Sequence, residues 1–197
     1  RMNSNSAGIQ YEFNTQNRKI YASAGTLLKL TYRYSAGNEE TNPGTTSESG
    51  TVNTNIAHEW HNANLKLDYF YKKRGVLRMG IYSDINYNDQ SLFSNYTASI
   101  LRSPTFQPIP ESKTLFLESF RAYKYVSIGQ KFIVTPLNNF DLRIGAYFMS
   151  PYRRVIKNED GTQSEKLGFE SLFSIATGTL VYNSPVGPIS IGLNYYY

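Results

Sequence analysis

Strict alternation of apolar and polar residues runs through almost the whole chain and limits what it can fold into. Within 139–150, Phe140, Leu142, Ile144, Ala146 and Phe148 alternate with Asn139, Asp141, Arg143 and Gly145. A period of two puts the apolar residues on one face of a β-strand, because successive side chains point to opposite faces. Helical periodicity is nearly absent, so the sequence predicts an all-β protein.

The alternation returns in about eight segments, each roughly nine to fifteen residues long, against a usual globular strand of about five or six. The clearest are 20–34, 65–71, 77–87, 126–134 and 186–197. Short turns are expected at 16–18, 73–75, 136–138 and 183–185, and long loops at about 36–52, 89–122 and 154–165. Because short and long connections alternate, we predict an antiparallel up-and-down meander over 1–197, without a second domain.

The apolar faces need either a protein core or a lipid bilayer. A bilayer crossing takes about nine to eleven tilted residues, which these segments provide. Aromatic residues gather near the predicted strand ends: Tyr32, Tyr34, Tyr69, Tyr71, Tyr87, Phe148, Tyr195 and Tyr197. This placement is typical of aromatic girdles. We therefore expect a transmembrane β-barrel in the outer membrane of a Gram-negative bacterium, with membrane lipid around it. The alternative is a soluble lipocalin-like or sandwich domain, which would need no detergent.

Composition narrows the choice of function further. The chain has 17 tyrosines, no cysteine and a formal net charge of +5. Tyrosine favours surfaces that are apolar at one end and wet at the other. Without cysteine, neither disulfides nor thiolate metal sites can form. The mild positive charge is spread along the chain apart from 72–74 and 153–154, so we expect no nucleic-acid partner.

A search for catalytic and metal-binding patterns finds little. The two histidines, His58 and His61, are spaced by three in a predicted strand, so their rings should point to opposite faces rather than share a metal. No nucleophile elbow and no phosphate-binding glycine motif occurs. The pairs Glu39-Glu40 and Glu159-Asp160 are interpreted as solvated turn residues. We expect no catalytic residue, no metal and no cofactor in this chain.

The stretch 102–122 is unusual for a loop because it combines three prolines with many apolar residues. A long loop with that much apolar surface should pack against something, and in a wide barrel the lumen is the natural place. Arg121 stands at its return to the wall. Within a confined lumen its guanidinium would bind a carboxylate, for which Asp141 is the candidate. Alternatively, Arg121 is an arginine of the solvated rim.

The segment 115–129 resembles the inward-folded loop of the BamA-like bacterial surface antigen superfamily. That loop carries Val-Arg-Gly-Phe/Tyr, whereas this chain has Phe120, Arg121, Ala122 and Tyr123, with alanine in place of the glycine. Longer phrases, 43–47, 92–99, 104–118 and 182–196, resemble the C-terminal barrel of patatin-like phospholipases of the outer membrane. The resemblance covers most of the chain, and 104–118 is its most specific part.

The resemblance implies a sixteen-stranded barrel in which five strands follow the motif loop. Here four are predicted after it, at about 123–135, 138–151, 166–183 and 186–197, so the chain would be the C-terminal half without its last strand. It also implies an upstream patatin-like lipid-hydrolysing domain, which the barrel anchors and can help export, and other outer-membrane subunits as partners. The alternative is a free-standing small barrel with a structural, adhesive or complex-forming role.

Overall fold

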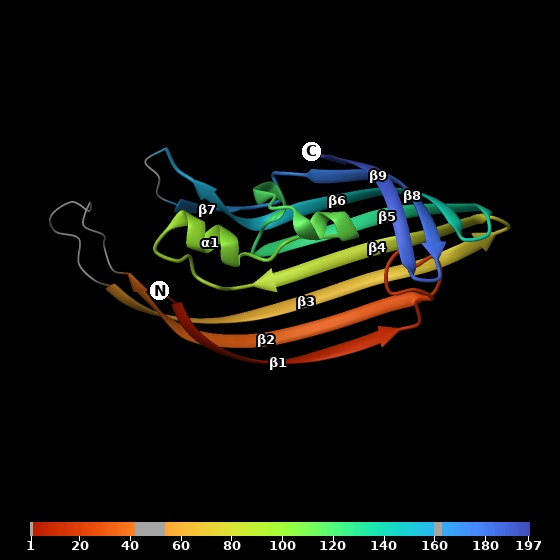
Figure 1. Ribbon diagram of the computed structural model, residues 1–197. Coiled ribbons are helices and arrows are strands. Elements are labelled where there is room, and N and C mark those ends of the chain that lie inside the picture. The colour runs from red at the N-terminus through yellow and green to blue at the C-terminus, as the bar shows by residue number, and fades with distance from the viewer. Residues whose placement is uncertain (1, 42–53, 160–162) are drawn as a thin grey trace.

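The computed structural model describes residues 2–41, 54–159 and 163–197, in which nine strands form one antiparallel sheet (Figure 1). The strands are β1 (Met2–Asn14), β2 (Thr26–Thr41), β3 (Thr54–Arg74), β4 (Leu77–Asn88), β5 (Lys124–Leu137), β6 (Phe140–Lys157), β7 (Gln163–Leu167), β8 (Phe173–Ser184) and β9 (Gly187–Tyr196). Their order is β1-β2-β3-β4-β5-β6-β8-β9, and β7 pairs with β6. The predicted all-β, up-and-down meander is therefore confirmed.

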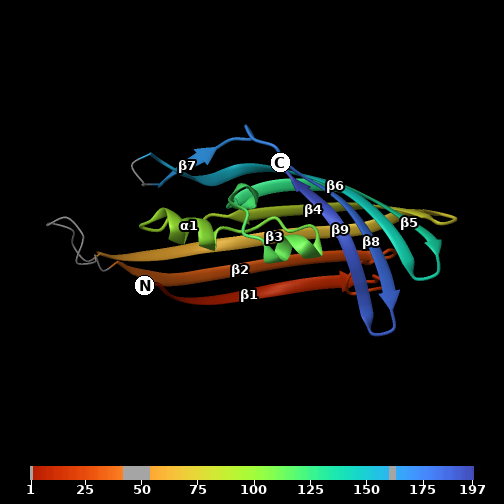
Figure 2. The same ribbon diagram turned by 45° about the horizontal axis from the view of Figure 1, so that its top comes forward.

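The sheet is long and curved. β3 has 21 residues and β6 has 18, well beyond the usual strand of about five or six. Figures 1 and 2 show the β8–β9 hairpin turned over toward the side of the sheet that carries the short helices. β1 and β9 form the two edges of the described sheet, and no pairing between them joins the edges.

Three of the four predicted short turns are confirmed at one end of the sheet. They connect β3 to β4 at 75–76, β5 to β6 at 138–139, and β8 to β9 at 185–186. Gly75 has a φ of 56° and Asn139 a φ of 66°. Glycine adopts this left-handed region without a Cβ clash, and asparagine tolerates it better than most residues. The turn chemistry of the sequence therefore matches the backbone.

The connection between β1 and β2 corrects the prediction. A turn at 16–18 and a strand from Ile20 were expected, but residues 15–25 form an irregular segment and β2 begins at Thr26. The side-chain oxygen Oδ1 of Asn17 accepts the backbone N–H groups of Ser23 at 2.9 Å and Ala24 at 3.1 Å. Such local side-chain bonds compete with strand pairing. These two hydrogen bonds hold the segment in an irregular conformation, although the apolar alternation of 20–24 is typical of a strand.

Long connections lie at the opposite end, with different bounds from those expected. β2 continues to Thr41, so part of the predicted 36–52 loop is strand, and 42–53 fall outside the described residues. β6 continues to Lys157 and pairs with β7, so the predicted 154–165 loop is mostly a hairpin, whose Asp160 is also not described. The segment 89–123 joins β4 to β5, close to the predicted 89–122.

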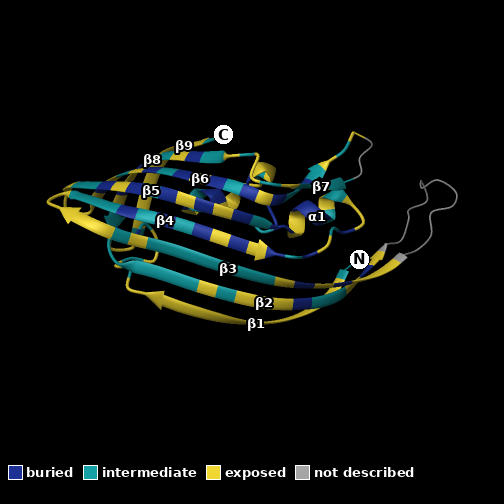
Figure 3. Ribbon diagram, turned by 180° about the vertical axis from the view of Figure 1, so that it is seen from behind, coloured by how far each residue is buried: buried dark blue, intermediate teal, exposed yellow. Residues whose placement is uncertain are grey.

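The two faces of the sheet differ in polarity, and the apolar face is the exposed one. Ile128 is 62% exposed, Ile144 54% and Leu193 85%. On the opposite face, Asp84 and Asp141 are buried at 2% and 1%. Figure 3 shows the alternation of buried and exposed residues along β4, β5 and β6. Apolar side chains therefore point away from the packed interior of the molecule.

The core lies between the concave face of the sheet and the segment 89–123. It contains Tyr82, Phe106, Ile109, Phe120, Ala122, Tyr125, Tyr147, Met149 and Ile175. The ring centroids of Tyr82 and Tyr147 are 5.7 Å apart in an edge-to-face arrangement, which aromatic pairs favour. Among the described residues, no helix combines the length and apolar character needed to cross a membrane. Burial is thus concentrated where the inserted segment meets the strands.

Candidate functional site

The segment 89–123 carries one helix, α1 (Tyr96–Arg102), and two 3-10 turns, η1 (Pro110–Thr114) and η2 (Glu118–Phe120). Asn95 starts α1, because its side-chain oxygen accepts the N–H of Ala98 at 2.8 Å. The part from 104 to 122 closes on itself: the N–H of Phe106 donates to Phe120 O at 2.9 Å. Pro108 and Pro110 have no backbone N–H, so this part of the segment has few donors for the hydrogen bonds of a regular helix or strand. The segment is therefore a compact insert rather than an open loop.

Residues 102–122 pack against the concave face of the sheet, and the return to the sheet is the most buried part. Phe120 is 3% exposed, and Ala122 and Tyr123 are both 0% exposed. The Phe120 ring lies 6.4 Å from Phe106 and 6.0 Å from Tyr196, measured between centroids. These aromatic contacts fix the insert against the sheet from β4 to β9.

Arg121 has a different partner from the one predicted. Its Nη1 donates to the carbonyl oxygens of Ile100 (3.3 Å), Leu101 (3.1 Å) and Ser103 (3.2 Å), and the guanidinium lies over the Phe116 ring at 4.6 Å. These carbonyls end α1, where helical partners run out and cations are favoured. Burial lowers the pKa of Arg121. The residue closes the insert internally and does not reach the wall.

Asp141 has other partners, so the predicted Arg121–Asp141 pair is wrong. Its carboxylate accepts from Arg18 Nη1 at 3.0 Å, Thr135 Oγ1 at 2.6 Å and Asn183 Nδ2 at 3.1 Å. Arg18 comes from the segment 15–25, which the sequence placed in a turn. Asp141 lies near the short-turn end of β6 and α1 near the opposite end. A buried carboxylate must be paired, and it takes the nearest cation.

The role expected of Arg121 belongs to Arg153 on β6. Its guanidinium makes two hydrogen bonds with the carboxylate of Glu165, one of them from Nε at 3.0 Å. It also donates to Gln90 O at 2.8 Å and lies 5.0 Å from the Tyr123 ring centroid. The backbone of Tyr123 donates to Arg153 O at 2.8 Å. Both ends of the insert are therefore tied to β6 at one arginine.

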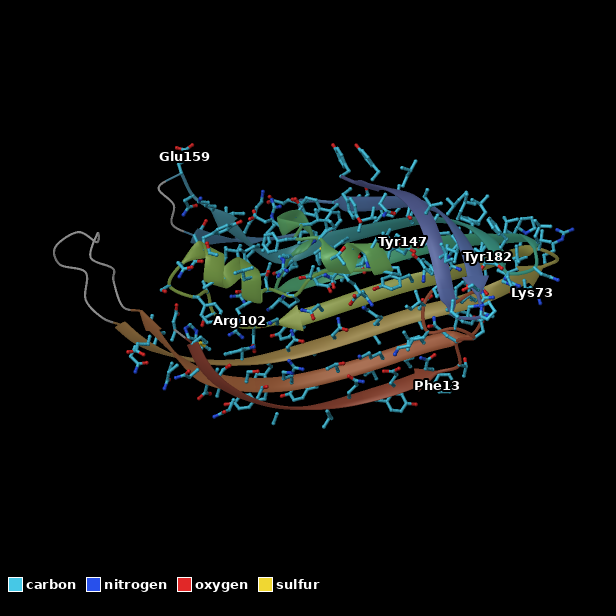
Figure 4. The ribbon with its side chains drawn as sticks, viewed as in Figure 1. Phe13, Lys73, Arg102, Tyr147, Glu159 and Tyr182 are labelled. Atoms are coloured by element: carbon cyan, nitrogen blue, oxygen red, sulfur yellow. The ribbon has the colours of Figure 1, made fainter. Side chains whose placement is uncertain are left out.

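A cavity of about 370 Å³, lined by both charged and apolar side chains, lies at the short-turn end of the insert. Its charged lining residues are Lys19, Lys66, Lys113, Lys131 and Arg143, with Asp68 and Glu111. Lys131 Nζ lies 2.7 Å from Asp68 Oδ2. Figure 4 labels Tyr147, which lines this cavity from β6. Cations outnumber carboxylates in the lining, so the cavity suits water and small anionic solutes.

Residues of the segment 15–25 line one side of this cavity. Arg143 donates from Nη1 to Tyr21 O at 3.1 Å and from Nη2 to Ala22 O at 2.6 Å. The Tyr21 hydroxyl binds Glu111 of the insert and Ser190 of β9. Burial, followed by the hydrogen bond to Glu111, raises the pKa of Tyr21. One irregular connection thus joins β6, β9 and the insert.

The histidines lie on opposite faces, as the spacing predicted. His58 is 2% exposed on the inner face, and His61 binds the Tyr32 hydroxyl at 2.7 Å on the outer face. Among residues 2–41, 54–159 and 163–197, no group of three or more metal-ligating side chains occurs. Glu39, expected in a solvated turn, is instead 5% exposed within β2.

Sequence reasoning missed the interior anchors Arg153, Glu165, Arg143 and Arg18. The polar residues of the alternating strands were a signal for the first three, because a polar residue in an interior must find a partner. Their partners come from segments distant in the chain, which periodicity does not reveal. No family model, curated protein or solved structure matches this chain.

Proposed function

We propose that this chain forms part of the wall of a transmembrane β-barrel in the outer membrane of a Gram-negative bacterium. The observation that carries the proposal is the exposed apolar face opposite a polar, covered one. A soluble β-domain places its apolar face in its core. Here the core lies against the polar face instead, and the residues Leu30, Ile85, Ile128, Ile144, Leu180 and Ile191 remain exposed. Contact with lipid tails would remove this surface from water.

The distribution of exposed aromatic residues supports the same proposal. One group, Tyr32, Tyr34, Tyr87, Tyr152 and Tyr195, lies toward the end with the long connections. The other, Phe13, Tyr69, Tyr71, Phe140 and Tyr182, lies toward the short turns. The outer face between them is mostly aliphatic, with Tyr11 and Phe132 as aromatic exceptions. Two aromatic bands that flank an apolar band are typical of membrane-spanning barrels, whose tyrosines meet the lipid head groups.

We further propose that the barrel is larger than this chain. An eight-stranded barrel has an interior filled by its own side chains, which leaves no room for the insert 89–123. In addition, β1 and β9 do not pair with each other, and an open sheet edge in hydrocarbon leaves backbone groups unsatisfied at several kcal/mol each. Further strands that pair with these edges would close the wall. A sixteen-stranded barrel, of which this chain is the C-terminal half without the last strand, meets both needs.

The function we propose for that barrel rests on the resemblance to the BamA-like superfamily and to patatin-linked barrels. The barrel would anchor an attached patatin-like lipid-hydrolysing domain and help export it, with other outer-membrane subunits as partners. The structure offers support in its insert, which packs on the inner face and returns through Phe120 and Arg121. The lipase chemistry would belong to the upstream domain.

The test is the intact mass of the native protein extracted from outer membranes. A mass several times the 22.4 kDa of this chain, with a patatin serine elbow in the additional sequence, is the expected result. A mass near 22.4 kDa would overturn the larger barrel. In that case the free-standing small barrel, with a structural, adhesive or complex-forming role, would replace it.

A further inference from the structure

Three side chains form a hydrogen-bonded series at the end of the sheet opposite the short turns. Glu39 lies near the end of β2, His58 near the start of β3, and Ser91 follows β4. The Nδ1 atom of His58 is 2.8 Å from Ser91 Oγ, and its Nε2 atom is 3.0 Å from Glu39 Oε2. A hydroxyl, an imidazole and a carboxylate in this order are the parts of an activated serine nucleophile.

The hydrogen bonds around Glu39 determine which nitrogen of His58 carries the proton. The backbone N–H of Ser94 donates to Glu39 Oε1 at 3.0 Å, and the Ser94 hydroxyl is 2.5 Å from the same oxygen. A carboxylate in such surroundings acts as an acceptor, so Nε2 of His58 must donate to it. In the neutral ring Nδ1 then has no proton and can only accept from the Ser91 hydroxyl. This is the tautomer that a general base requires.

Exposure changes along the series in the direction that catalysis requires. Glu39 is 5% exposed and His58 2% exposed, whereas Ser91 lies on the surface. The Phe93 ring covers the imidazole, with 4.9 Å between the ring centroids. The base and its orienting carboxylate are therefore shielded from water, and the hydroxyl is accessible to a substrate.

A donor for the developing negative charge lies next to the serine. Leu92 directly follows Ser91, and its backbone N–H binds no other group in the described part of the chain. In serine hydrolases with a nucleophile elbow, the N–H of the residue after the nucleophile stabilises the oxyanion. The elbow motif itself is absent, so this arrangement could not be found from the sequence pattern.

We propose that Ser91, His58 and Glu39 form a hydrolytic site for carboxylic esters. Ser91 Oγ attacks the ester carbonyl carbon while His58 Nδ1 takes the hydroxyl proton. His58 returns this proton to the leaving oxygen, and the alcohol departs. A water molecule then gives a proton to His58 Nδ1 and attacks the acyl-serine. His58 returns this proton to Ser91 Oγ as the acyl–oxygen bond breaks, so the carboxylic acid leaves and Ser91 is restored. Glu39 stabilises the imidazolium in both steps. The site does not depend on the proposed barrel size or on an upstream domain.

The first experiment uses the full chain in detergent micelles with a fluorophosphonate probe and p-nitrophenyl butyrate. We expect covalent labelling on the peptide that contains Ser91. Hydrolysis should fall at least about hundredfold in Ser91→Ala and in His58→Gln, as when a member of a serine triad is removed. Ser119→Ala, at an exposed serine of the insert, should leave both signals unchanged. Absence of labelling at Ser91 would overturn the proposal.

The second experiment keeps the proposal falsifiable if His58→Gln fails to fold. Because the chain has no cysteine, Ser91→Cys introduces a single thiol. Its alkylation rate against pH should reveal a thiol pKa clearly below about 8.5, the ordinary value, because His58 accepts the proton. Ser119→Cys should give the ordinary value. If the alkylation rates of Ser91→Cys and Ser119→Cys depend on pH in the same way, His58 only holds residues 91–94 against the sheet. That result would overturn the proposed hydrolytic site.

Discussion

Arg153 on β6 and Glu165 on β7 form a two-bond ion pair, and the same guanidinium binds the backbone carbonyl oxygen of Gln90. Arg153 is 9% exposed, whereas the Glu165 side chain is 31% exposed, so the pair lies at the boundary between the interior and solvent. The interaction joins a hairpin at the long-connection end of the sheet to the first residues of the insert. Arg153 Nη1 also donates to Asn88 O at 3.4 Å. Because arginine offers five donors in a rigid fork, it can hold the carboxylate and both carbonyls at once.

We predict that Arg153→Ala destabilises the protein by about 1–3 kcal/mol, because it leaves the buried carbonyl oxygens of Asn88 and Gln90 without their donor and removes the ion pair with Glu165. Denaturant unfolding in detergent would measure the change in free energy. Lys157→Ala, at an exposed position of the same strand, is the control and should change it by less than about 0.5 kcal/mol. Equal effects of both variants would contradict the anchoring role.

For Arg121→Ala we expect a loss of about 1–2 kcal/mol, because three carbonyl oxygens at the end of α1 lose their donor. The loss should be local. Limited proteolysis should cut within 96–121 faster than in the parent chain, while the strands stay protected. Arg102→Ala, at an exposed arginine in the last turn of α1, is the matched control. Proteolysis within 96–121 at the rate of the parent chain would count against the role of Arg121.

Asp141→Asn should cost about 2–3 kcal/mol, because Arg18 and its neighbours would then surround a neutral amide in a site that is 1% exposed. The effect should include release of the segment 15–25. Hydrogen exchange of the Ser23 and Ala24 amides would detect that release. Glu12→Gln, at an exposed position of β1, should leave their exchange unchanged. If the Ser23 and Ala24 amides already exchange fast in the parent chain, the prediction is refuted.

A charged substitution on the exposed apolar face tests whether this face contacts lipid. Ile144→Arg places a cation in the middle of the apolar band and should destabilise the protein folded into lipid vesicles by about 2–4 kcal/mol. Val186→Arg, in the β8–β9 turn, is the control, because Val186 is 97% exposed but lies outside the band. If the apolar face met water instead, both variants would be close to neutral. That outcome would contradict the proposed function.

The pH dependence should reveal Tyr123. Burial raises the pKa of Tyr123 to about 12 from the ordinary 10.0. The raised pKa favours the neutral form in the folded state. The contribution of Tyr123 to the free energy of unfolding is therefore fully present below pH 10 and is lost as the pH rises toward 12. The fall attributable to this residue is up to about 2–3 kcal/mol. In Tyr123→Phe the free energy of unfolding should depend less on pH over that range. An unchanged slope would refute the assignment.

The strand faces were predictable because alternation reports polarity directly. Segments such as 77–87 and 126–134 became β4 and β5 with the expected faces, and the insert was recognised from its apolar residues and prolines. The segment 15–25 was missed because its conformation depends on Asn17 and on Arg143, which lies far away in the chain. The pairing of Arg121 failed for a related reason. Sequence distance does not indicate which polar groups meet inside a curved sheet.

The position of the insert has a consequence for the order of folding. It connects β4 to β5, which pair directly, and its Phe120 packs against Tyr196 of β9. Bringing Phe120 against β9 closes a longer stretch of chain than pairing β4 with β5, so it costs more entropy. We therefore expect the β4–β5 pairs to form before the insert meets β9, and substitutions at the Phe120–Tyr196 contact to change the unfolding rate more than the folding rate.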